Sequence, residues 1–252
     1  MSIAGAQVAH SDTITFNAVA DTTLLEASPD NNNGGQSFVN AGTTQNYGHN
    51  RGLFRFDLSS IPAGATITGG SLTLQVVQQP RDGYNPATFG VFRMLTSWGE
   101  GNQVADDPAS PGLGAPAAAG EATWNSRFAL TPGGAWAAPG GAAGIDFVGV
   151  ASSTVNVYGT GESPYIFSGE GTLLEDLQYW VQHPNANFGW MLMPLNAEDN
   201  FTARRFASHE DQDFGPQLVI DFTPVPEPSV YTLAGLGLGA LLIWRRRTRS
   251  VQ

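Results

Sequence analysis

The chain contains no cysteine and no lysine among its 252 residues, and only 13% of its residues are charged. The absence of cysteine excludes disulfides, cysteine-ligated zinc sites and cysteine nucleophiles. Four of the eleven arginines, Arg245, Arg246, Arg247 and Arg249, stand near the C-terminus. Residues 1–224 hold the other seven against 21 acidic residues, a net charge of −14. A body this acidic repels nucleic acid and anionic lipid, so we expect no nucleic-acid partner.

Glycine and proline are abundant, with 31 and 16 residues, and 41% of the residues are hydrophobic. This composition is typical of a turn-rich sheet protein with a buried core. Apolar and polar residues alternate, as a half-buried strand requires: Phe54 and Phe56 are predicted to face inward, and Arg55 and Asp57 outward. Other strands are predicted at 12–18, 71–77, 88–95, 145–158, 188–195 and 217–222.

One segment, 172–182, has helical rather than strand periodicity, with Thr172 and Glu175 forming a predicted capping box. Residues 99–144 are rich in Gly, Ala and Pro and are predicted to form long loops with one short strand at 122–124. Many short strands and a single helix predict an all-β fold, a jelly-roll β-sandwich with one short amphipathic helix.

The domain boundaries follow from composition. Residues 1–11 are predicted to be an N-terminal remnant, in which Ala4-Gly5-Ala6 resembles the end of a signal peptide; an unstructured terminus is the alternative. The β-sandwich is assigned to 12–223, and the proline-rich 224–229 forms an extended linker.

Residues 230–252 are predicted to form a single transmembrane helix and an Arg-rich tail. The 15 residues after the linker carry no charge and would span roughly 22 Å as a helix, short of a bilayer core of about 30 Å. Tyr231 and Trp244 stand at the ends of this stretch, where interfacial aromatic residues belong. The arginines that follow predict a stop-transfer signal that holds the C-terminus in the cytoplasm.

This tail resembles the PEP-CTERM sorting signal. The motif is Val225, Pro226, Glu227, Pro228 and Ser229, followed by the apolar stretch and the Arg-rich end. The resemblance implies that a membrane-embedded exosortase cuts near the motif. The protein is therefore expected to be exported, held in the inner membrane before processing, and then found at the cell surface or outside the cell.

The body of the chain resembles the DNRLRE family of jelly-roll modules, which accompany polysaccharide-active enzymes. The matching segments are Arg51–Ile67, Val91–Trp98, Thr123–Asn125, Trp180–Leu192 and Phe206–Ile220. The resemblance implies a jelly roll in contact with carbohydrate. The loop at 101–120 departs from the family, since it is longer and richer in Ala and Pro.

Four residues are candidate ligand-binding residues. Trp136 lies in a Gly/Pro-rich loop and is expected to be exposed, so that it and Tyr84 could stack on sugar rings. Arg204 and Arg205 are the only adjacent basic residues before the tail. They could bind a uronate carboxylate, and a structural salt bridge is the alternative.

Asp30 and Asn32 offer oxygen ligands for a structural calcium ion, although a solvated turn accounts for the same residues. No other cofactor is expected, and the four His residues lack the spacing of a zinc site. Candidate glycosidase carboxylates are Glu100, Glu121, Glu162, Glu170 and Glu210.

These observations predict a non-catalytic envelope or extracellular-matrix protein that contacts polysaccharide. The first alternative is a structural or adhesive biofilm-matrix component without a sugar site. The second is a small polysaccharide-cleaving enzyme.

Replacing Arg245, Arg246 and Arg247 by neutral residues is expected to abolish retention and processing, because the stop-transfer charge is lost. Fractionation and immunoblotting of the precursor and mature forms measure this. Normal maturation of the triple variant would contradict the predicted topology.

Overall fold

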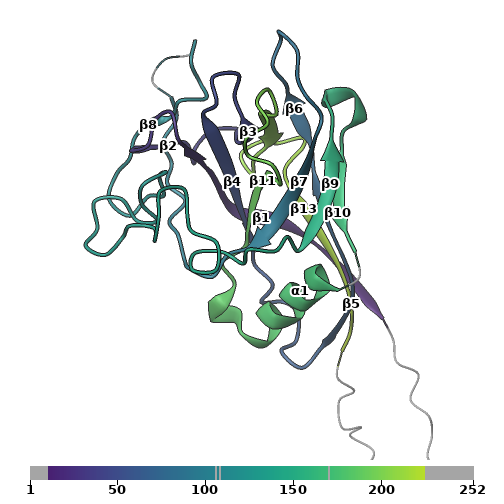
Figure 1. The fold of residues 1–252 in the computed structure, drawn as a ribbon. Coiled ribbons are helices and arrows are strands. Elements are labelled where there is room, and N and C mark those ends of the chain that lie inside the picture. The colour runs from purple at the N-terminus through teal and green to yellow at the C-terminus, as the bar shows by residue number, and fades with distance from the viewer. Residues whose placement is uncertain (1–10, 106, 108, 170, 225–252) are drawn as a thin grey trace, which may run out of the picture.

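The computed structural model describes residues 11–224, apart from 106, 108 and 170, and is mostly β-structure with one helix (Figure 1). This confirms the predicted fold class; the jelly-roll connectivity and the domain boundaries stay predictions. The strands are β1 Asp12–Leu25, β2 Asn31–Asn32, β3 Phe38–Thr43, β4 His49–Phe56, β5 Thr66–Leu74, β6 Val76–Gln78, β7 Ala87–Arg93, β8 Ala115–Pro116, β9 Ser153–Val157, β10 Tyr165–Ser168, β11 Trp190–Pro194, β12 Arg204–Ala207 and β13 Gln217–Thr223. Helix α1 is Thr172–Gln182, and 3₁₀ turns lie at Thr160–Glu162 and Pro184–Ala186.

The longest strand, β1, pairs with two different strands along its length. Residues 12–17 pair antiparallel with β13, and residues 18–25 pair antiparallel with β4. A register shift between Ala18 and Ala20 separates the two halves. Bulges of this kind bend a strand and increase its twist. β1 therefore joins the group β10-β5-β13 to the group β4-β11-β7-β9.

A second corner is made where β5 gives way to β6 after the single residue Gln75. β5 pairs with β13 and β10, whereas β6 pairs with β12. β12 also pairs with β3, which returns to β4. Arg204 and Arg205 thus lie on β12, the strand that connects β6 to β3 through hydrogen bonds, an element that was not predicted from the sequence.

The main core fills the space between the two groups of strands. Phe54 and Phe56 are buried, Arg55 is half-buried and Asp57 is exposed, so the predicted register is confirmed. Other large side chains of this core come from β5, β7, β10, β11, β12 and β13, and include Leu72, Leu74, Phe89, Val91, Tyr165, Phe167, Trp190, Leu192, Phe206, Leu218, Ile220 and Phe222.

Helix α1 has the predicted bounds and packs mainly against β5. It buries Leu173, Leu177 and Trp180 in the main core, as the helical spacing predicts. The predicted capping box is wrong. Gly171, with φ of 94°, is the N-cap, and Thr172 is the first helical residue. Glycine suits this position because it adopts positive φ without a steric penalty.

The described residues of the segment between β7 and β9, within 94–152, form a further layer outside the strands, which we call the loop layer. It lies beside β4 on the left in Figure 1 and carries β8, while the predicted short strand at 122–124 is absent from the described structure. Its aromatic side chains pack on the outer face of the strands, against residues such as Leu53 and Met191. The buried aromatic residues are Trp98, Trp124, Trp136 and Phe147. The group of strands that contains β4 and β11 is therefore covered on one face by the main core and on the other face by the loop layer.

No helix in the part of the chain that the structure describes is long and apolar enough to cross a membrane. The predicted helix and Arg-rich tail at 230–252, the sorting motif at 225–229 and residues 1–10 of the predicted remnant lie outside the described residues.

Truncating Phe56 to Ala is expected to lower the free energy of unfolding by about 3–5 kcal/mol, because the ring is fully buried between the strands. Urea denaturation of the two proteins measures the difference. Ile166, which is 52% exposed on β10, provides the control, and its truncation should cost less than about 1 kcal/mol. Equal losses for the two variants would show that the burial pattern does not control stability.

Candidate functional site

The first candidate ligand-binding residue, Arg204, is 1% exposed and points into the protein. Its guanidinium group donates hydrogen bonds to the backbone carbonyls of Tyr158, Phe201, Ala203 and Asn85. Ligand binding by the arginine pair stays a prediction; both residues line the groove described below, but Arg204 is buried whereas Arg205 is half-buried. Alternation along β12 explains why: neighbouring residues of a strand point to opposite faces.

Tyr84 and Trp136 are also engaged in contacts within the protein. Tyr84 is half-buried, with the guanidinium carbon of Arg204 4.4 Å from the centre of its ring. Trp136 is 5% exposed, and its Nε1 donates to the carbonyl of Thr123 at 2.8 Å. The expectation that Trp136 is exposed for sugar stacking is wrong, because the loop layer folds it against the outer face of the sheet.

The candidate calcium residues do not converge on a common point. Asn32 is fully buried, and its side-chain oxygen accepts hydrogen bonds from the backbone N–H groups of Gly34 and Gln103. Asp30 is exposed and accepts a hydrogen bond from Asn125 at 2.9 Å. The alternative, an Asp/Asn turn, describes Asp30, while Asn32 fastens the loop layer to the sandwich.

A groove of about 430 Å³ lies at the end of the domain where β1 and β6 finish. Its described lining combines apolar residues with a group of hydrogen-bonding side chains. The polar lining residues are Asn40, Thr44, Asn50, Gln78, Gln79, Ser110, Arg204 and Arg205. No described lining residue is acidic. Residues 1–224 carry a net charge of −14, so a groove lined by arginine without a described carboxylate is a favourable place for an anion to bind.

Arg205 holds its place in the groove through two contacts. Its guanidinium carbon lies 4.2 Å from the centre of the Phe38 ring, and its Nη1 donates to Gln78 Oε1 at 2.7 Å. A Cβ atom on Gly112 would lie only 3.2 Å from Arg205 Nη2, so the loop layer approaches this side chain closely. These contacts fix the guanidinium group of Arg205 beside the amide side chains that line the groove.

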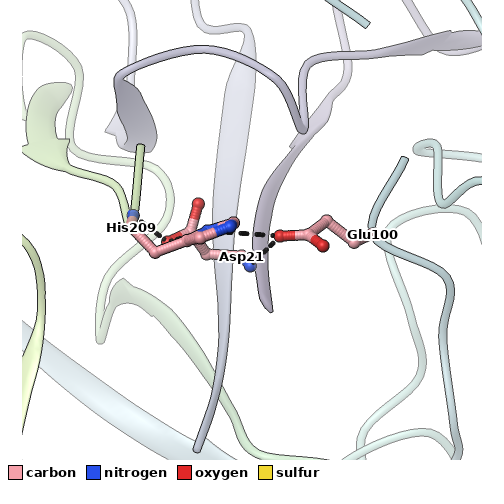
Figure 2. Close-up of side chains that lie close together, drawn as sticks. All are labelled: Asp21, Glu100 and His209. Atoms are coloured by element: carbon pink, nitrogen blue, oxygen red, sulfur yellow. Dashed lines mark hydrogen bonds and ion pairs between the residues drawn. The ribbon is translucent and has the colours of Figure 1, made fainter. Parts of the chain in front are cut away.

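A second cluster of chemically active side chains joins Asp21, Glu100, His209 and Glu210. Figure 2 shows Asp21 on β1 between Glu100 on one side and His209 on the other. His209 Nδ1 lies 3.4 Å from Asp21 Oδ2 and 3.3 Å from Glu100 Oε1, and its Nε2 lies 3.2 Å from Glu210 Oε1. Asp21 and Glu100 are also tied by the backbone: Asp21 N–H donates to Glu100 Oε1, and His209 N–H donates to Asp21 Oδ2.

The electrostatics of this cluster favour a bound proton. Burial raises the pKa of Asp21 to about 6 and the pKa of Glu100 to about 7. The hydrogen bond to Asp21 and the charges of the neighbouring carboxylates raise the pKa of His209 to about 9. The side-chain atoms of Asp21, Glu100 and His209 lie within 4.8 Å of one another. A proton on His209 would be shared among carboxylates on both sides of the ring, with Asp21 and Glu100 facing Nδ1 and Glu210 facing Nε2.

Sequence reasoning named Glu100 and Glu210 only as members of a list of glycosidase carboxylates, and it interpreted His209 as a surface residue. The structure brings these three residues together around Asp21, which was not a candidate. Of the other carboxylates, Glu121 accepts hydrogen bonds from Asn102, Gln103 and Ala118. Glu162 accepts one from Gly159, and Glu170 lies outside the described residues.

The C-terminal tail matches a known protein-sorting motif. Residues 224–247 match the PEP-CTERM protein-sorting motif. The chain carries a PEP-CTERM sorting signal. This signal indicates an exported protein that an exosortase sorts, with a membrane-linked stage before processing. The match covers the tail alone, and no match to the DNRLRE family was found, so that resemblance of the ectodomain stays a prediction. No curated protein matches this PEP-CTERM chain.

Replacing Arg204 by Ala is expected to lower the free energy of unfolding by about 3 kcal/mol, because buried carbonyls lose a charged donor. Urea denaturation measures the loss. Arg81→Ala is the matched control, since it removes the same charge from an exposed position and should change stability by less than about 0.5 kcal/mol. An Arg204→Ala protein as stable as the control would contradict the structural role.

Proposed function

We propose that this PEP-CTERM protein is a non-catalytic component of the cell envelope or extracellular matrix, and that its ectodomain binds an acidic polysaccharide in the Arg205 groove. The observation that carries the proposal is the composition of the groove. It presents arginine and amide side chains, with no acidic residue in its described lining, on a domain that is otherwise strongly acidic.

The chemistry of the groove suits a uronate polymer. A planar guanidinium group binds a carboxylate through two parallel hydrogen bonds, and its geometry here is fixed by Phe38 and Gln78. Amide side chains such as Asn40 and Asn50 can both donate to and accept from sugar hydroxyls. Leu25, Pro80 and the loop-layer residues beside them supply apolar surface for the sugar C–H groups.

The position of the groove also supports this role. Thr223, the last residue of β13, leaves the domain beside the start of β1, and the groove lies at the opposite end of β1, at Leu25. The groove therefore lies at the end of the domain far from the point at which the chain continues toward its sorting signal. The resemblance of the ectodomain to DNRLRE jelly rolls favours the same class of ligand.

The two alternatives make different demands on the structure. A polysaccharide-cleaving enzyme of the usual kind needs two carboxylates flanking the bound sugar, and the described lining of the groove contains none. A structural matrix component needs no groove at all. Binding measurements therefore separate the proposal from both alternatives.

Isothermal titration of the full chain in detergent, with alginate as the uronate polymer and a neutral glucan as comparison, tests the proposal. We expect heat with alginate only, and weaker binding at high salt because the contact is ionic. Arg205→Ala should weaken alginate binding at least about tenfold, since one charge-assisted contact contributes about 1.5–3 kcal/mol.

Arg81→Ala is the control, because it removes the same charge outside the groove and should leave alginate binding within about twofold of the wild type. Heat with alginate that Arg205→Ala does not change would place the ligand elsewhere. No heat with any glycan, from a protein whose cooperative unfolding is normal, would favour the structural matrix alternative.

A further inference from the structure

The cluster around His209 joins three segments that are far apart in the sequence. Asp21 belongs to β1, which links the two groups of strands, and Glu100 lies at the start of the loop layer. His209 and Glu210 follow β12. The cluster is therefore a point at which the loop layer is fastened to the sandwich through charges rather than through apolar contacts.

We propose that Asp21, Glu100, His209 and Glu210 form a pH-sensitive latch, in which protonated His209 holds the loop layer against the β-sandwich and deprotonation releases it. The latch does not depend on what the groove binds.

The charges facing His209 explain why the proton matters. A carboxylate approaches the imidazole from each element packed against it: Asp21 from β1, Glu100 from the loop layer and Glu210 from its own loop. Asp21 is 1% exposed, so its charge is poorly solvated. Removing the proton from His209 takes away the positive charge and leaves carboxylates that repel one another, because solvent screens charges only weakly at this partly buried position.

The direction of the pH dependence follows from linkage. The pKa of His209 is raised to about 9 from an ordinary value of about 6.5. Its contribution to stability is therefore fully present below about pH 6.5 and is lost as the pH rises through about 9. The pKa values of Asp21 and Glu100 are also raised, so their ionisation at lower pH changes stability in the same direction.

The response is expected in the loop layer rather than in the whole domain, because Glu100 supplies the contact of the loop layer with His209, whereas β1 is also held by its ladders with β13 and β4. Two backbone hydrogen bonds beside Glu100 report on it. Ala122 N–H donates to the carbonyl of Gly99 at 2.7 Å, and Gly35 N–H donates to the carbonyl of Gln103 at 3.0 Å. Opening the latch should expose both amides to solvent exchange.

Hydrogen exchange of the full chain in detergent, read by mass spectrometry between pH 6.5 and 9.5, tests the latch. Rates are corrected for the chemical exchange rate at each pH, and EDTA is present so that no bound cation contributes. We expect protection of peptides containing Gly35 and Ala122 to fall at least about tenfold across this range, since one unit of pKa difference changes the equilibrium tenfold. Peptides from β13 should not change, which shows that the sandwich stays folded.

Two variants and a control separate a latch from general alkaline instability. His209→Arg carries a permanent charge, so its loop layer should stay protected at pH 9.5. His209→Gln has no charge, so its loop layer should be poorly protected already at pH 6.5. His183→Gln, which changes an exposed histidine at the end of α1, should behave like the wild type. The latch is overturned if wild-type protection does not change with pH, or if His209→Arg loses protection at pH 9.5 as the wild type does.

Discussion

The double pairing of β1 is the constraint on which the rest of the structure depends. Its first half belongs to one group of strands and its second half to the other, with the bulge between Ala18 and Ala20 turning the strand from one to the other. A single strand therefore sets the relative position of the two layers that enclose Phe54 and Phe56. It also carries Asp21 into the charged cluster and brings Leu25 to the edge of the groove.

Most of the arginines outside the tail contact aromatic rings instead of standing free at the surface. Six ectodomain arginines lie over aromatic rings: Arg51, Arg55, Arg93, Arg127, Arg204 and Arg205. A guanidinium group can stack on a ring and donate to several acceptors in one plane, which a lysine ammonium cannot do. The absence of lysine is consistent with this use, since Arg204 contacts Tyr84 and bonds four carbonyls at the same time.

Local patterns in the sequence predicted what local forces control. Alternation placed Phe54 and Phe56 correctly, helical spacing placed α1, and the motif in the tail identified the sorting signal. The failures arose where distant segments meet. Trp136 sits among glycines and prolines, and its burial depends on a loop layer that covers the second face of the sheet.

The same limit explains what was missed at the candidate sites. The alternation that would have separated Arg204 from Arg205 could be used only once β12 was known to be a strand. Nor does sequence spacing indicate the bond between His209 and Asp21, because 188 positions separate the two residues. Such contacts follow from the order of the strands, which single-sequence patterns do not determine.

The antiparallel pairing of β1 with β13 has a mechanical consequence. The C-terminal chain leaves at Thr223, whereas the groove lies beyond Leu25, at the far end of β1. A polymer held in the groove while the tail is anchored would pull the two strands past each other along their length. Ladder hydrogen bonds lie across that direction, so those between residues 12–17 and β13 would share the load together rather than open in turn. If the proposed function holds, this pairing would let the domain resist tension between the anchored tail and a polymer in the groove.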